Sequence, residues 1–200
     1  MKNPFLVGER IYLRPIEPED APAFVAWFND QEVTQYLLRH RPMTMADERE
    51  FIARITQEPN AMSLGIALRA DDRLIGSAGL HHIDQRCRTA SFGISIGEKS
   101  EWNRGLGGEA TTLILRHAFL THNLHRVWLQ VHAFNGRAIR CYERLGFRHE
   151  GTLREEVFRD GRYWDTLVMG ILEREWRELN PLAHAAAAPG EDLKARGGAS

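Results

Sequence analysis

The stretch from residue 91 to residue 147 constrains the fold of this chain more than any other part. It contains SFGISIGEKSEWNRGLGGEATTLILRHAF and, a few residues later, VWLQVHAFNGRAIRCYERLGF. Its apolar patterns predict strands over 89–96 and 126–132 and helices over 105–123 and 136–145. The second helix stops at Gly146, a residue typical of the position just after a helix. The stretch is therefore a strand–turn–helix–strand–helix unit.

Antiparallel hairpins are predicted on both sides of this unit. Strands are expected over 10–14, 64–69, 74–83, 147–159 and 162–172. Asp71-Asp72 predicts a tight turn, and Asp160-Gly161 is the strongest hairpin signal in the chain. Two amphipathic helices are expected near the N-terminus, the second opened by a Thr44/Asp47 capping box. The element order predicts an α+β fold.

Length and composition predict one globular unit. The chain has 200 residues, 43% of them hydrophobic, which is enough for one sizeable core. We expect a single domain over residues 1–180. Residues 183–200, AHAAAAPGEDLKARGGAS, are small and polar and predict a disordered tail.

Charge and cysteine content exclude several classes. A net charge of −1 argues against nucleic-acid binding, and two cysteines without CxxC spacing predict neither disulfides nor a metal site. No apolar run approaches the roughly 18 residues that span a bilayer, and the N-terminus lacks a secretory h-region. We expect a reduced cytoplasmic protein that does not bind membranes.

The glycine-rich turn predicts an anion site. Gly105, Gly107 and Gly108 let backbone N–H groups converge, the following helix adds its positive end, and Arg104 adds a charge. A P-loop would need a Lys-Ser/Thr pair here, and a dinucleotide fingerprint would need GxGxxG. The alternative is a tight turn that binds nothing.

A tyrosine on the next helix is a candidate acid. Asn135 and Tyr142 are seven residues apart, so both face one side together with Ala138 and Ile139. If that side faces the turn, Asn135 can bind a ligand amide and Tyr142 can reach its reactive end. The alternative for Tyr142 is a core aromatic near Phe147.

Together these residues resemble the GNAT superfamily of acyl-CoA-dependent N-acetyltransferases, in particular its ribosomal-protein and spermidine acetyltransferase branch. The resemblance covers about residues 8–176. Its most specific blocks are ISIGEKSEWNRGLGGEA, NGRAIRCYERLGFRHEGTLRE and FRDGRYWDTLVMGIL. It implies a three-layer structure with a mixed, mostly antiparallel sheet that splays open where the cofactor enters.

The resemblance also implies roles for single residues. The backbone of Ile94, Ser95 and Ile96 pairs with the pantetheine arm of acetyl-CoA, and Asn135 contacts it. Arg104, Gly105, Leu106, Gly107 and Gly108 hold the pyrophosphate, and Tyr142 is the acid. Trp102 stands where the family commonly has Gln or Arg, which removes one side-chain donor and leaves the backbone donors.

The general base stays open at this stage. The strand over 89–96 carries no carboxylate, where many relatives have a glutamate. His81 and His82 have a suitable pKa, and Glu98 or Glu101 can act through water. Each of the four has an ordinary structural explanation as an edge or loop residue.

Three hypotheses remain for function. The first is acetylation of a protein or peptide α-amine, the second acetylation of a polyamine or another small amine such as an aminoglycoside, and the third a CoA-binding sensor without turnover. An acidic slot would attract a cationic acceptor, although the solvated outer faces of two amphipathic helices are the better explanation for most of these acidic residues. The acidic residues of this region are Glu17, Glu19, Asp20, Asp30, Glu32, Asp47, Glu48, Glu50 and Glu58. Relatives are often homodimers, but no interface is readable here.

Overall fold

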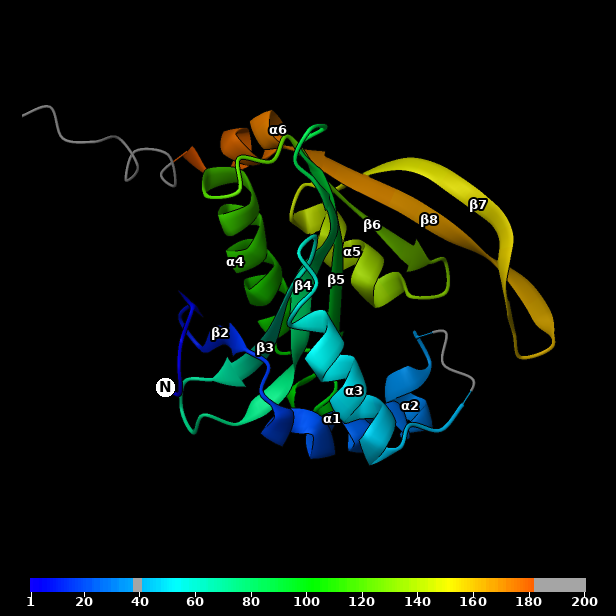
Figure 1. The fold of residues 1–200 in the computed structure, drawn as a ribbon. Helices are drawn as coiled ribbons and strands as arrows, with labels where there is room; N and C mark the ends of the chain where they lie inside the picture. The colour runs from blue at the N-terminus through cyan, green and yellow to red at the C-terminus, as the bar shows by residue number, and fades with distance from the viewer. Residues whose placement is uncertain (38–40, 182–200) are drawn as a thin grey trace, which may run out of the picture.

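A computed structural model describes residues 1–37 and 41–181 of the chain (Figure 1). The strands are β1 (Leu6–Val7), β2 (Ile11–Pro15), β3 (Met62–Leu68), β4 (Leu74–Asp84), β5 (Thr89–Ile96), β6 (Arg126–His132), β7 (Arg148–Arg159) and β8 (Arg162–Leu172). The helices are α1 (Ala21–Phe28), α2 (Gln31–Thr34), α3 (Met45–Ile55), α4 (Leu106–Leu120), α5 (Gly136–Arg144) and α6 (Glu173–Leu179), with 3-10 turns at Pro18–Asp20 and Lys99–Glu101. The predicted tail over 183–200 lies outside the described residues.

The described strands form one sheet in the order β1-β2-β3-β4-β5-β6-β8-β7. Every neighbouring pair is antiparallel except β5 and β6. Those two pair in parallel only from Thr89–Arg126 to Ser91–Trp128, and then they diverge. The remainder of β5 pairs with β4 alone, through Ile96. The expected mixed, mostly antiparallel sheet that splays open is confirmed.

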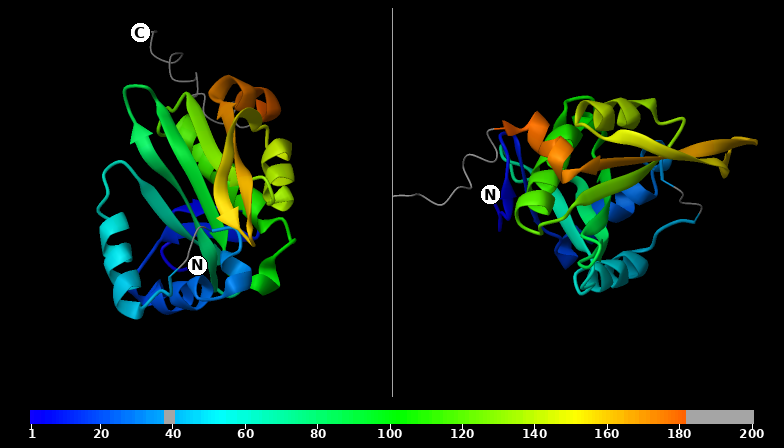
Figure 2. Two further views of the ribbon diagram at one scale, coloured as in Figure 1. Left: turned by 90° about the vertical axis from the view of Figure 1, so that its right-hand side faces the viewer. Right: turned by 90° about the horizontal axis from the view of Figure 1, so that it is seen from above.

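Helices cover both sides of the sheet. The two views of Figure 2 place α3 and α5 on opposite sides of it. α4 packs against β2, β4 and β5 and contributes Ile114, Leu115 and Phe119 to the main core. A smaller apolar cluster, which includes Phe24 and Ile52, joins α1 to α3. The main core therefore lies between α4 and the sheet.

Local turn chemistry explains most element boundaries. Gly146 has φ +94°, and the N–H of Phe147 donates to the Tyr142 carbonyl at 3.0 Å, as in a Schellman cap. Asp160 and Gly161 both have positive φ, the geometry of a two-residue type I′ hairpin. The Thr44/Asp47 capping box is formed. These three predictions are confirmed.

Other details differ from the sequence-based expectations. The β3–β4 connection runs from residue 69 to residue 73, because Asp72 adopts the left-handed conformation within a wider loop, so a tight turn was wrong. Three short elements were not anticipated, namely β1, α2 and α6. They have from two to seven residues, too few for a periodic signal.

Gly79 on β4 tests how tightly the central strands pack. A Cβ added there would lie 2.2 Å from the Met62 carbonyl oxygen of β3, so the backbone would have to shift. We expect Gly79→Ala to lower the free energy of unfolding by about 1–3 kcal/mol, measured by urea denaturation. Gly151→Ala on β7 is the control, because nothing lies within 4 Å of its Cβ. Equal midpoints for the two variants would contradict this packing.

Candidate active site

A cavity of about 770 Å³ opens where β5 and β6 diverge. β5 and β6 contribute lining residues from either side, as do the first turns of α4 and the whole length of α5. Nine of the ten site residues predicted from sequence line it: Ile94, Ser95, Ile96, Gly105, Leu106, Gly107, Gly108, Asn135 and Tyr142. The fold therefore brings the glycine-rich turn, the strand and the tyrosine to one place.

The N-terminus of α4 presents free donors to this cavity. Gly105 is the N-cap and has φ +78°, a conformation that strongly favours glycine. Leu106, Gly107 and Gly108 donate their backbone N–H groups to no residue in the described ranges. Three such N–H groups at the positive end of a 15-residue helix have the geometry that suits an anion.

Trp102 fixes the turn that precedes α4. Its indole Nε1–H donates to the carbonyl of Ile96 at 2.8 Å, which ties the turn to the end of β5. The guanidinium of Arg137 from α5 lies 4.8 Å from the Trp102 ring centroid and 5.8 Å from that of Tyr36. A tryptophan at this position thus supplies a structural tie and a cation–π contact across the mouth of the cavity.

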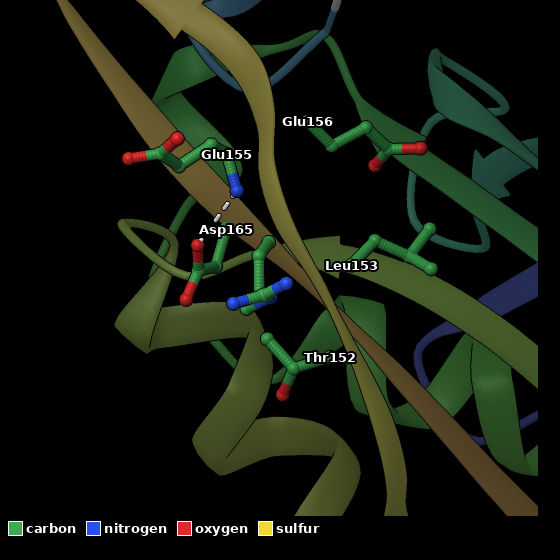
Figure 3. Close-up of a pocket in the computed structure, with 6 residues that line it drawn as sticks. Thr152, Leu153, Glu155, Glu156 and Asp165 are labelled. Carbon is green, nitrogen blue, oxygen red and sulfur yellow. Dashed lines mark hydrogen bonds between the residues drawn. The ribbon is translucent and has the colours of Figure 1, made fainter.

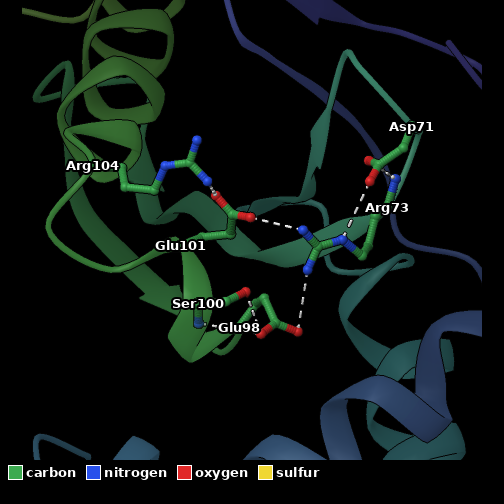
Figure 4. A network of polar contacts seen from close by, with 6 residues as sticks. All are labelled: Asp71, Arg73, Glu98, Ser100, Glu101 and Arg104. Carbon is green, nitrogen blue, oxygen red and sulfur yellow. Dashed lines mark hydrogen bonds and ion pairs between the residues drawn. The ribbon is translucent and has the colours of Figure 1, made fainter.

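Arg104 is the one predicted site residue that does not line the cavity. Its guanidinium Nη1 donates to Oε2 of Glu101 at 2.7 Å, and Arg73 donates to Oε1 of the same carboxylate at 2.7 Å (Figure 4). Arg73 also pairs with Glu98 at 3.5 Å. Glu101 is only 4% exposed, so this buried carboxylate holds the turn before α4 through two arginines.

Arginines of α5 line the cavity as well. Arg137, Arg140 and Arg144 line it from one stripe of α5 and form no ion pair with any residue in the described ranges. Glu101 is the only carboxylate among the described residues that line this cavity, and two arginines already neutralise it. The cavity therefore carries a net positive charge and favours an anionic ligand.

Asn135 and Tyr142 lie on α5 as the sequence predicted. Asn135 is the N-cap, and its Oδ1 accepts the Ala138 N–H at 3.2 Å. Its amide nitrogen donates to no described residue, so it remains available to a ligand. Tyr142 packs edge-on against Phe92 of β5, with ring centroids 6.4 Å apart.

The Tyr142 hydroxyl is suited to donating a hydrogen bond. Burial raises the pKa of Tyr142 above its ordinary value of about 10, and the nearby Cys141 adds to the shift. The group is therefore protonated at neutral pH. In the described ranges its hydroxyl has no hydrogen-bond partner, which leaves it free for a ligand.

A second cavity of about 300 Å³ adjoins the first across β5. Both are lined by Leu37, Gly93, Ile94 and Ser95. The second cavity reaches beneath α1 and α3 and is lined mostly by apolar side chains. A ligand in one cavity can therefore meet a ligand in the other at the middle of β5.

The four candidate bases lie in different surroundings. His81 lines the second cavity, with its Nε2 3.5 Å from where a Cβ on Gly93 would be. Burial lowers the pKa of His81, and the charge of His82 adds to the shift. His82 is exposed and bonds Ser91 at 3.0 Å, outside both cavities. Glu98 and Glu101 belong to the ion-pair network around Arg73.

A third hollow, of about 800 Å³, is separate from this site. It lies on the β7–β8 hairpin and is lined by Thr152, Leu153, Arg154, Glu155, Glu156 and Asp165 (Figure 3). The Glu155 N–H donates to Asp165 at 2.8 Å, while the Glu155 and Glu156 side chains lie on opposite sides of β7. It shares no lining residue with the other two cavities.

Neither a metal-binding cluster nor a membrane-spanning helix is found within residues 1–37 and 41–181. No cluster of three or more His, Cys, Asp or Glu side chains in these ranges could hold a metal ion. No helix in the same ranges is long and apolar enough to cross a membrane.

The known proteins to which this chain is similar are acetyltransferases. The family model described as "Acetyltransferase (GNAT) domain" matches residues 10–148. The uncharacterized N-acetyltransferase p20 of Bacillus licheniformis is 31% identical, over 86% of this chain and 97% of that protein. The spermidine N(1)-acetyltransferase of Vibrio cholerae is also 31% identical, over 85% and 97%. A crystal structure of spermidine N-acetyltransferase from Vibrio cholerae, in complex with CoA and spermine, superposes with a TM-score of 0.78 at 26% identity, covering 84% of this chain and 99% of that one.

Glu101 gives a direct test of the ion-pair network beside α4. Glu101→Gln keeps the size of the side chain and removes the charge shared by Arg73 and Arg104. We expect the free energy of unfolding to fall by about 1–2 kcal/mol, since both arginines are partly exposed and screened. Urea denaturation measures it, with the exposed Glu50→Gln on α3 as the control. A loss no larger than in the control would show that the network does not stabilise the turn.

Proposed function

The chain belongs to the GNAT family of acetyltransferases, and from this membership we propose that its first cavity holds acetyl-CoA and its second admits the amine acceptor. The chain is an acyl-CoA-dependent N-acetyltransferase. The observation that carries the assignment of the site is the joint lining of one cavity by the α4 N-terminus, β5 and Tyr142. A relative named for spermidine, solved with CoA, supports the same donor.

The first cavity suits the chemistry of coenzyme A. The pyrophosphate of CoA can accept hydrogen bonds from the free backbone N–H groups of Leu106, Gly107 and Gly108. Its negative charge complements the arginines of α5, which form no ion pair with a described residue. Its pantetheine arm has amides that match the unpaired edge of β5 at Ile94–Ile96 and the free amide nitrogen of Asn135. The side chain of Arg104 is held by Glu101, so the backbone donors dominate this site.

The reaction we propose is a direct attack of the amine nitrogen on the acetyl carbonyl carbon. The N–C bond forms, the C–S bond breaks, and the sulfur leaves as a thiolate that accepts a hydrogen bond from Tyr142. A thiol has a pKa of about 8.5, and burial raises the pKa of Tyr142 further above it. Full proton transfer is therefore uphill, and the hydroxyl acts by stabilising the departing thiolate.

His81 is the base that fits this geometry. Among His81, His82, Glu98 and Glu101, only His81 lines the acceptor cavity, and its imidazole forms no ion pair or hydrogen bond with a described residue. Burial lowers the pKa of His81, so its imidazole is neutral at pH 7 and can take the proton of the attacking amine. Its lowered pKa keeps it neutral somewhat below pH 6.5 as well.

The first candidate acceptor is the α-amine of a protein or peptide. An α-amine with a pKa of about 8 is roughly a tenth neutral at pH 7, while an alkylamine near 10.4 is almost fully charged. A histidine of lowered pKa is a weak base and suits the α-amine better. A polyamine is the second candidate, because a 31% identical relative is named for spermidine.

Tyr142→Phe tests the proposed acid. It removes only the hydroxyl, so the packing against Phe92 is retained. We expect kcat for release of free CoA thiol from acetyl-CoA and an amine panel to fall about 10²–10⁴-fold. A colorimetric thiol assay measures it, with Tyr163→Phe on the exposed hairpin as the control. A fall of less than about threefold would remove Tyr142 from this role, and acetyl-CoA binding without release by the unmodified chain would favour a sensor.

Gly107→Val tests the backbone cradle. A Cβ on Gly107 has room, with its nearest atoms the side chains of Ile94 and Ile96 at 3.9 Å, but it points into the cavity. We expect the Kd for acetyl-CoA to rise by about tenfold or more, because the side chain blocks approach to the N–H groups. Isothermal titration calorimetry measures the Kd, and thermal unfolding checks that the fold is kept. An unchanged Kd in a folded variant would place the pyrophosphate elsewhere.

A further inference from the structure

The second cavity has an apolar wall built by two helices. Phe24 and Phe28 of α1 stack with ring centroids 5.8 Å apart, and Phe51 of α3 lines the cavity with them. Small residues on the sheet leave the space open: Ser63, Ser77, Gly79, Gly93 and Ser95. A volume of about 300 Å³ is at the small end of ligand sites, so it holds one compact group.

Acidic residues near this cavity are mostly committed to structure. Asp20 pairs with Arg14 at 2.7 Å, and Asp30 and Glu32 both pair with Lys99, at 2.7 and 2.9 Å. Among the described residues, neither cavity is lined by Glu17, Glu19, Asp20, Asp30, Glu32, Asp47, Glu50 or Glu58. Glu48, which is 1% exposed, is the one carboxylate in the described lining of the second cavity.

One carboxylate can match at most one ammonium. Each cation taken out of water without a partner carries a desolvation cost, so a polyamine with two or three charges along its length fits this lining poorly. The lining of the first cavity adds to the cost, because Arg137, Arg140 and Arg144 repel further positive charge. The three phenylalanine rings instead favour an apolar group.

We infer that the acceptor is a primary amine with a single positive charge and a compact apolar substituent that fills the cavity between α1, α3 and β5. This inference rests on the proposed function and narrows its acceptor. The amine can come from a free arylalkylamine or alkylamine, or from a peptide whose first residue is large and apolar. The amine nitrogen forms the new N–C bond, its proton passes to His81, and the C–S bond breaks to release free CoA.

An acceptor panel tests this directly. The full chain is given acetyl-CoA and, separately, 2-phenylethylamine, spermidine, a tetrapeptide that begins with Phe and a matched tetrapeptide that begins with Asp. Thiol release gives kcat/KM for each. The two apolar amines are 2-phenylethylamine and the Phe peptide. We expect kcat/KM for at least one of them to exceed that for spermidine by about tenfold or more, and kcat/KM for the Phe peptide to exceed that for the Asp peptide. The two apolar arms tell a free amine from a peptide terminus.

Phe51→Ala tests the wall of the cavity. Phe51 is half-buried and lies outside the apolar cluster that joins α1 to α3, and thermal unfolding of the variant checks that the fold is kept. We expect kcat/KM for the preferred apolar amine to fall by about tenfold, and the Kd for acetyl-CoA to stay within about twofold. Phe158→Ala is the matched control, because Phe158 is 63% exposed on the β7–β8 hairpin and lines none of the three cavities.

Three results would overturn the inference. A higher kcat/KM for spermidine than for both apolar amines would assign the chain to polyamines and leave the proposed acetyl transfer intact. Equal rates for the Phe and Asp peptides together with no reaction of 2-phenylethylamine would show that no apolar group enters the cavity. Thiol release with none of the amines would refute the proposed function itself, and the inference with it.

Discussion

The parting of β5 from β6 is the constraint on which the site depends. The two strands share three residue pairs, and beyond Ser91 the edge of β5 has no neighbouring strand. Backbone N–H and C=O groups away from water need partners, and the Ile96 carbonyl on this edge accepts from the indole N–H of Trp102. An extended ligand with amides of its own would complete the sheet where the strands leave it incomplete.

The divergence is held open by the registers on either side. β6 pairs with β8 along its whole length, from Arg126 to His132, so it cannot turn back toward β5. β5 is fixed in turn by β4 through Ile96. The rings of Phe92 and Tyr142 then fill the angle between the strands. The cavity is thus part of the folded chain before any ligand arrives, and binding need not supply the energy of opening it.

The features that could be predicted from the sequence are those that depend on local chemistry. Gly146, the Asp160-Gly161 turn and the Thr44/Asp47 box depend on neighbours within a few residues, so their geometry could be predicted. The position of the Arg104 side chain depends on Glu101, which also accepts a hydrogen bond from Arg73, some thirty residues away from Arg104 in the sequence. No pattern in the sequence signals that pairing.

The choice between the two histidines also required the fold. His81 and His82 are neighbours, and only the pairing of β4 with β5 directs His81 to the cavity and leaves His82 at the surface. The pairing of the acidic residues near the N-terminus also required the fold. Their partners, such as Lys99 for Asp30, come from distant segments, so composition alone could not tell which of these acidic residues are paired.

An apolar acceptor cavity has a consequence for reactivity as well as for selection. Surroundings that lower the pKa of His81 by burial disfavour any nearby cation, and they act on the ammonium form of a bound amine in the same direction. An α-amine is about a tenth neutral at pH 7, and lowering its pKa by one unit makes about half of it neutral and nucleophilic. The desolvation that weakens binding of the charged amine thus increases the reactive fraction of what is bound. A weak base such as His81 is then sufficient, because much of the deprotonation precedes the attack.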